Sequence, residues 1–255
     1  MNSMHDKQAA GISLASPLIW LARGWRDLRR APLPGLVHGL CVLLFGALLL
    51  SLAGSQFWWL AGAFSGFMLV APVVATGLYS VSRGLERSEP VGLREVLALW
   101  RSRDARLVGF GLLLGLVGTV WVLTSASLLA WLAPAPINSL QDFLRHLVLA
   151  DSPFLFELWM LCGGLLAAPV FASSVLTMPM LLDRDCSLDS AVRASWRAVA
   201  DYPLVSAFWA LLIVLLVLLG LLTWLLGLLV VTPWLGHASW HAYRDLSASV
   251  IEGDR

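Results

Sequence analysis

The sequence contains few charged residues and a single lysine. Asp, Glu, Lys and Arg make up 13% of its 255 residues, about half the share that is usual in a soluble domain. The net charge of +1 leaves no basic stripe of the kind that binds nucleic acid. With 59% hydrophobic residues and a mean hydropathy of +0.81, the chain is predicted to be an integral membrane protein whose main partner is the lipid bilayer.

The motifs of common catalytic centres are also missing. The chain has no phosphate-binding Gly-x-x-x-x-Gly-Lys-Ser/Thr loop, no Gly-x-Ser-x-Gly elbow and no Cys/His zinc spacing. The three cysteines form no CxxC pair, so a disulfide framework is not expected. The N-terminal segment lacks the apolar core of a signal peptide, and the first apolar run is predicted to stay as a membrane span. These absences predict a non-enzymatic protein with no catalytic residue and no metal site.

Long apolar runs divide the chain into membrane spans of about 20 residues. Six spans are predicted, at about 35–53, 57–81, 107–133, 154–182, 204–220 and 223–243. The last two share one run, 204–242, which is about twice the length of a span and is predicted to turn near Thr223. The fold class is therefore an all-α transmembrane bundle of three hairpins, with five spans as the alternative. Residues 16–246 form one membrane domain between tails at 1–15 and 247–255.

The arrangement of basic residues predicts the topology. Of the 17 Lys and Arg residues, all but Arg145 fall before the first span, between the second and third, between the fourth and fifth, or after the last. Because basic residues accumulate on the cytoplasmic side, both termini are predicted to lie in the bacterial cytoplasm. Five spans would instead place Arg244 and Arg255 outside.

Three short amphipathic segments precede the first, third and fifth spans. In the first, Leu18 and Leu21 fall on an apolar face with Ser16 at the N-cap, whereas Arg23 and Asp27 fall on the polar face. Each segment carries a Trp-Arg pair: Trp25-Arg26, Trp100-Arg101 and Trp196-Arg197. We expect short helices in the membrane interface, anchored by these pairs.

A proline lies near the cytoplasmic end of each even-numbered span: Pro72, Pro179 and Pro233. In two copies an aromatic residue follows after seven positions and an arginine after eleven, namely Tyr79 and Arg83, and Trp240 and Arg244. The middle copy reaches Asp183 instead. The pattern predicts three copies of one unit, as in membrane transport folds, and chance similarity among leucine-rich helices is the alternative. These residues are candidates for functional or structural roles.

Three further sets of residues are candidate sites. His237 and His241 lie one helical turn apart, a spacing that allows two imidazoles to bind a metal or haem, and His38 could lie at the same depth. The alternative is a hydrogen-bonded interfacial histidine, and no cofactor is predicted. Glu157 could take part in proton or substrate binding, or remain hydrated at the outer end of its span. A cytoplasmic cluster could pair with Arg83 or Arg244, and the alternative is a solvated loop with structural ion pairs. Its members are Asp183, Arg184, Asp185, Asp189 and Arg193.

Residues 71–90, 178–203 and 231–246 resemble a bacterial family of uncharacterised integral membrane proteins, the domain of unknown function family 2189. The likeness extends from about Leu18 onward. It implies a helical inner-membrane protein without an established activity. The sequence therefore predicts a transport-related protein or a structural or assembly partner in the membrane, with a haem- or metal-associated redox protein as the alternative. A homo-oligomer or a membrane-protein partner is left open.

Overall fold

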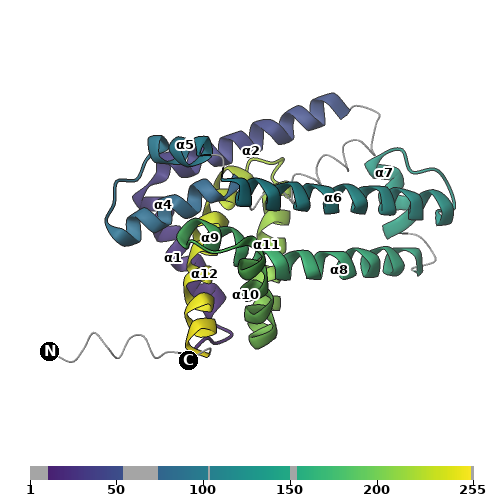
Figure 1. Ribbon diagram of the computed structural model, residues 1–255. Helices are drawn as coiled ribbons and strands as arrows, with labels where there is room; N and C mark the ends of the chain where they lie inside the picture. The colour runs from purple at the N-terminus through teal and green to yellow at the C-terminus, as the bar shows by residue number, and fades with distance from the viewer. Residues whose placement is uncertain (1–10, 54–73, 103, 150–153, 254–255) are drawn as a thin grey trace.

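The computed structural model describes residues 11–53, 74–102, 104–149 and 154–253, and Figure 1 shows the arrangement of their helices. The first half comprises α1 (Ser16–Arg30), α2 (Pro32–Ala53), α4 (Thr76–Arg87), α5 (Leu93–Arg101), α6 (Ala105–Leu132), α7 (Leu140–Phe143) and a π-helical turn (Leu144–Val148). The second comprises α8 (Phe154–Ser174), α9 (Thr177–Asp183), α10 (Leu188–Asp201), α11 (Pro203–Leu222) and α12 (Leu228–Gly253). No strand occurs among these residues, and the all-α prediction is confirmed.

Four helical segments of the described chain are long and apolar enough to cross a bilayer: Pro32–Ser51, Ala105–Leu132, Phe154–Asp183 and Pro203–Leu222. They correspond to the first, third, fourth and fifth predicted spans. Residues 57–73 of the second predicted span, including Pro72, lie outside the described residues. The sixth has no counterpart among the four, because the second half of α12 carries histidine and charged side chains. Six spans therefore stay a prediction.

The run 204–242 is interrupted where the sequence predicts a turn. Helix α11 ends at Leu222, and the next helix begins at Leu228. Trp224 and Leu225 have φ angles of 55° and 69°, in the left-handed region that non-glycine residues rarely adopt. The Thr223 hydroxyl stabilises the turn, since it accepts the amide hydrogen of Gly227 and donates to the carbonyl of Gly220, both at 2.8 Å.

Helix α12 lies at the centre of the packing and contacts α1, α2, α4, α9, α10 and α11. Glycines bring the neighbouring helices close to its backbone: a side chain at Gly24 of α1 would overlap Ala238, and one at Gly39 of α2 would overlap the carbonyl of Leu229. Pro233 lacks the amide hydrogen that would bond that carbonyl within α12. The proline thus leaves α12 unbroken and marks the place where α2 packs against it.

Helices α6 and α8 lie side by side and extend away from this centre (Figure 1). The Trp159 indole of α8 donates a 2.7 Å hydrogen bond to Ser125 of α6. Large apolar side chains on both helices are exposed, among them Leu112 and Leu165. In Figure 1, α2, α6 and α8 extend toward the same side of this centre, whereas α11 and α12 run across them. The three predicted hairpins stay a prediction.

Short helices form at the three predicted amphipathic segments. In α1 the N-cap is Ala15 rather than Ser16. This helix buries Trp20, Gly24 and Asp27. The prediction that Asp27 lies on the exposed polar face of the helix is therefore wrong. Its neighbour α12 takes up that face because Gly24 allows a close approach. The tryptophans of the three Trp-Arg pairs are exposed: Trp25, Trp100 and Trp196. Their interfacial placement stays a prediction.

Candidate functional site

Ion pairs join four sequence segments around the polar half of α12. The N-terminal segment pairs with the last helix, and the segment between the second and third predicted spans pairs with both the later loop and the last helix. The pairs are Arg23–Asp245 at 3.0 Å, Arg87–Asp183 at 2.6 Å, Arg106–Asp185 at 3.3 Å and Arg244–Glu86 at 3.0 Å. These four segments are the arginine-rich ones from which the sequence predicts the topology, and they lie together in the fold.

A buried chain of polar side chains links α1, α4 and α12. Nδ1 of His237 lies 2.8 Å from the Ser82 hydroxyl, and Nε2 of His241 lies 2.8 Å from a carboxylate oxygen of Asp27. Ser82 also forms a hydrogen bond with Asp27. The order along the chain is therefore His237, Ser82, Asp27 and His241. His237 is fully buried, whereas the side chain of His241 is 17% exposed.

The Asp27 carboxylate is stabilised in its charged form. Burial by itself raises the pKa of this group, but the hydrogen bond and the charge of His241, together with Ser82, lower the pKa below its ordinary value. The carboxylate and the imidazole therefore hold α1 against α12 as a charge-assisted pair. Sequence analysis missed Asp27 and Ser82, because their burial depends on how three helices pack.

Two buried imidazole nitrogens lack a partner among the described residues. His38 donates from Nδ1 to the carbonyl of Pro34 at 2.7 Å, which leaves its Nε2 as an acceptor. That Nε2 and the Nε2 of His237 are both buried without a hydrogen bond. His38 lies close enough to His237 for the two rings to interact electrostatically. That His38 lies at the same depth in the membrane as the histidine pair stays a prediction.

His237 and His241 face different partners, Ser82 and Asp27. Among the described residues, no group of three His, Cys, Asp or Glu side chains is placed to hold a metal ion. The Ser82–His237 pair also differs from a catalytic triad, because Asp27 bonds the serine rather than the second imidazole nitrogen. The redox alternative thus gains no support from this geometry.

An arginine cluster, defined by Arg83, Arg87, Arg184 and Arg244 with Glu86 and Asp183, lies at the end of α9. Asp183 is 3.6 Å from Arg244, one of its two predicted partners. The other, Arg83, donates to the carbonyl of Leu182 at 2.6 Å instead. The predicted positions Pro179 and Trp240 are both buried nearby, and the Trp240 indole donates to Glu86 at 3.1 Å.

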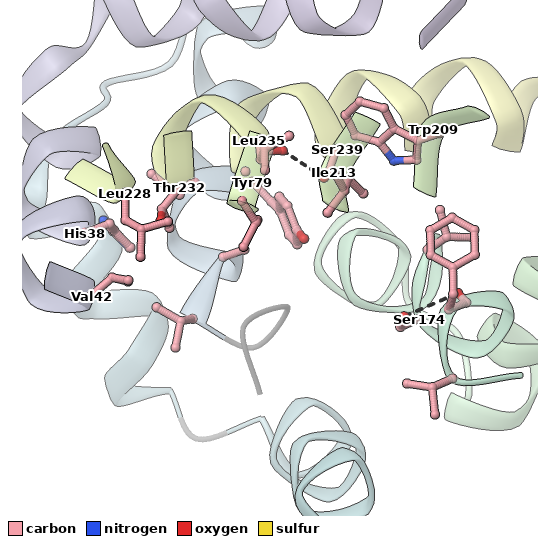
Figure 2. A pocket seen from close by; sticks show the side chains of 18 of the residues that line it. His38, Val42, Tyr79, Ser174, Trp209, Ile213, Leu228, Thr232, Leu235 and Ser239 are labelled. Carbon is pink, nitrogen blue, oxygen red and sulfur yellow. Dashed lines mark hydrogen bonds between the residues drawn. The ribbon is translucent and has the colours of Figure 1, made fainter. Parts of the chain in front are cut away.

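A cavity of about 320 Å³ opens between α4, α8, α11 and α12, with His38 and Val42 of α2 at one end (Figure 2). Most of its lining is aliphatic or aromatic, including Val170, Trp209 and the predicted candidate Tyr79. The hydroxyls of Ser174 and Ser239 in the wall donate to carbonyls of their own helices, Phe171 and Leu235. The wall is therefore largely apolar although it contains several hydroxyl groups.

The remaining candidates lie apart from these groups. Glu157 is exposed in the first turn of α8 and does not line the cavity. Arg26, Arg101 and Arg197 are exposed on α1, α5 and α10. Sequence analysis missed Glu86 and Tyr243, although Tyr243 lies in the quoted stretch 231–246 and donates to Asp183 at 2.8 Å.

The middle of the chain matches a known protein-family model. Residues 59–183 match the family described as a predicted integral membrane protein, DUF2189. The resemblance is confirmed. The matched DUF2189 region includes α4 through α9, whereas the quoted residues 231–246 lie outside it, so the match is narrower than the expected likeness. No curated protein and no solved structure matched the chain.

Proposed function

We propose that the chain is a non-enzymatic, transport-related protein of the bacterial inner membrane that binds an apolar small molecule. The cavity is the observation that supports this function. Its volume of about 320 Å³ falls at the lower end of the range of ligand pockets. Because Ser174 and Ser239 use their hydroxyls within their own helices, a ligand meets a largely hydrocarbon surface. A hydrophobic ring system or part of an acyl chain suits that surface.

The position of the cavity also gives it access to the hydrocarbon core of the bilayer. It is bordered by α8 and α11, two of the candidate membrane-spanning helices. Both helices expose large apolar side chains on other faces, among them Leu165 and Leu218. Such faces are stable against lipid and would be unfavourable in water. An apolar molecule dissolved in the bilayer could therefore reach the cavity without passing through water.

The proposed topology has six spans, both termini in the cytoplasm, and α1, α5 and α10 in the membrane interface. The ion pairs support it, because they hold four arginine-rich segments together, as a common cytoplasmic face requires. Reporter fusions at Trp224 and after Arg255 are expected to report periplasmic and cytoplasmic locations respectively. A cytoplasmic signal at Trp224 would contradict the sixth span, and the predicted threefold repeat with it.

Filling the cavity tests ligand binding. Val170→Trp places a large side chain in the wall, and Leu165→Trp places the same side chain on an exposed position of the same helix. Full-length proteins are purified in mild detergent, and the apolar molecule that co-purifies is measured by mass spectrometry of organic extracts. We expect the amount bound to Val170→Trp to be lower than in the wild type by a factor of about five or more. Leu165→Trp should match the wild type. Equal retention in all three folded proteins would contradict the proposal.

The same purified protein tests the redox alternative. A haem-bound protein would show a Soret absorption band that His237→Ala and His241→Ala both remove. A colourless protein without bound metal, measured by absorption and elemental analysis, rules out this alternative. The remaining alternative, a structural or assembly partner in the membrane, is favoured if the protein holds no apolar molecule and instead co-purifies with another membrane protein in a fixed ratio.

A further inference from the structure

We propose that the arginine cluster binds a phosphate group through Arg83 and Arg184. The cluster contains four guanidinium groups and two carboxylates, so its local charge is positive. The guanidinium groups come from three elements: Arg83 and Arg87 from α4, Arg184 from the end of α9, and Arg244 from α12. Positive side chains that are partly buried are normally paired with an equal number of negative groups. The excess charge indicates that an anion belongs to the site.

The two carboxylates are already engaged by the other two arginines. Asp183, whose side chain is 5% exposed, accepts hydrogen bonds from Arg87 at 2.6 Å and from the Tyr243 hydroxyl at 2.8 Å. Glu86 accepts hydrogen bonds from Arg244 at 3.1 Å and from the Trp240 indole at 3.1 Å. Their negative charge is therefore matched locally.

Arg83 and Arg184 have only neutral partners in the described part of the chain. Arg83 donates from Nη1 to the carbonyl of Leu182 at 2.6 Å, and its Nε is buried with no hydrogen-bond partner. Arg184 donates from Nε to the Tyr243 hydroxyl oxygen at 3.2 Å. A buried N–H group without an acceptor is unfavourable, and more so when it is charged. An anionic oxygen beside Arg83 would remove that cost.

The chemistry of these groups favours phosphate. Guanidinium groups bind phosphate oxygens in a forked geometry with two parallel hydrogen bonds. Leu182 and Arg184 are two residues apart, so the carbonyl that binds Arg83 lies next to the second arginine. The neighbouring Arg106 adds no positive charge to the site, because it pairs with Asp104 at 2.8 Å and with Asp185 at 3.3 Å. Two unmatched guanidinium groups suit one phosphate.

The phosphate could belong to a lipid headgroup or to a free phosphate in solution. The cluster lies at the end of the candidate span Phe154–Asp183, where a membrane helix meets the headgroup region. Its outer members Arg87 and Arg244 have side chains that are 47% and 41% exposed, so a soluble anion also has access. Both sources offer the same oxygens to the same two arginines.

The test compares Arg83→Gln and Arg184→Gln with the wild type. Arg193→Gln is the matched control, because Arg193 pairs with Asp189 on the exposed surface of α10. Full-length protein in detergent is titrated with inorganic phosphate at constant ionic strength and, separately, with phosphatidylglycerol or phosphatidylcholine in mixed micelles. The thermal unfolding midpoint reports binding. We expect the apparent affinity of both cluster variants to be at least about tenfold weaker than that of the wild type. The apparent affinity of the control variant should equal that of the wild type.

The outcomes separate the two sources. A rise in the midpoint with inorganic phosphate identifies a free phosphate, whereas a rise only with phosphatidylglycerol identifies a lipid headgroup. Arg83→Lys, which keeps the charge without the planar fork, should bind with intermediate affinity. Arg184→Gln decides the matter if Arg83→Gln does not fold, because the side chain of Arg184 forms a single hydrogen bond with the described residues, to the Tyr243 hydroxyl. The proposal is overturned if no ligand shifts the midpoint of the wild type, or if the cluster variants respond as strongly as Arg193→Gln.

Discussion

The region around α12 and the arm formed by α6 and α8 solve the same packing problem in different ways. Around α12, glycines bring helices into backbone contact, and hydrogen bonds and ion pairs join α1, α4, α9 and α12. In the arm, two long helices meet through a small apolar cluster and one Trp159–Ser125 hydrogen bond, and half of their leucines are exposed.

This difference shows where each region obtains its stability. Lipid is as apolar as leucine, so exposed leucines in the arm gain little from contact with other helices in a bilayer. Polar groups such as Asp27 and His237 are costly wherever they are buried, unless a partner is fixed in place. The α12 region should therefore respond strongly to single substitutions, and the exposed faces of the arm should tolerate them.

The largest expected effect is at Gly39. Gly39→Ala places a methyl group against the carbonyl of Leu229 and must push α2 away from α12. We expect a loss of about 3 kcal/mol or more of unfolding free energy, measured by thermal unfolding in detergent. Gly164→Ala in the arm has open space around it and should leave the midpoint unchanged. Equal midpoints for both variants would remove the contrast between the two regions.

Asp27→Asn removes the charge that pairs with His241 and keeps the size of the side chain. The variant should lose about 1–3 kcal/mol at neutral pH. Because the pKa of Asp27 is lowered on folding, its contribution is complete above the ordinary carboxyl pKa and disappears as the pH falls through the lowered value.

The unfolding midpoint measured against pH tests this linkage. The difference between the wild type and Asp27→Asn should shrink below about pH 4, where the ordinary carboxyl begins to take up its proton. A difference that stays constant from neutral pH to strong acid would show that the charge of Asp27 does not contribute.

The same Ser→Ala substitution can be made in both regions. Ser82→Ala removes a partner of both His237 and Asp27, and should cost about 1–2 kcal/mol. Ser125→Ala removes the acceptor of Trp159 in the arm, and should cost under about 1 kcal/mol. Chemical unfolding curves of the two variants measure the difference. The reverse order would show that the arm depends on its polar contact more than α12 does.

The smallest effect is expected at the surface of α6. Leu112 is 71% exposed, and Leu112→Ala should change the unfolding free energy by no more than about 0.5 kcal/mol in a detergent micelle. Leu114, two residues along, is 2% exposed, and Leu114→Ala should cost about 2–4 kcal/mol. A large loss at Leu112 would indicate that another protein, rather than lipid or detergent, covers this face.

Much of the helical architecture could be predicted from the sequence. Apolar run length predicted α2, α6 and α11 to within about three residues, and amphipathic spacing predicted α1, α5 and α10. The residues seven positions after Pro72 and Pro233 were predicted to be equivalent, but they have different surroundings. Tyr79 lines the cavity, whereas Trp240 contacts Glu86. Equal spacing along two helices therefore did not produce equal surroundings.

The sequence by itself determined that the chain is helical and belongs in a membrane, because run length and charge content depend on local composition alone. Only the tertiary structure decided which polar residues matter. Asp27 looks like a surface residue in its own helix, and it becomes buried because Gly24 lets α12 approach and His241 supplies a partner. The unmatched charge of Arg83 and Arg184 likewise follows from the meeting of α4, α9 and α12, which no local pattern encodes.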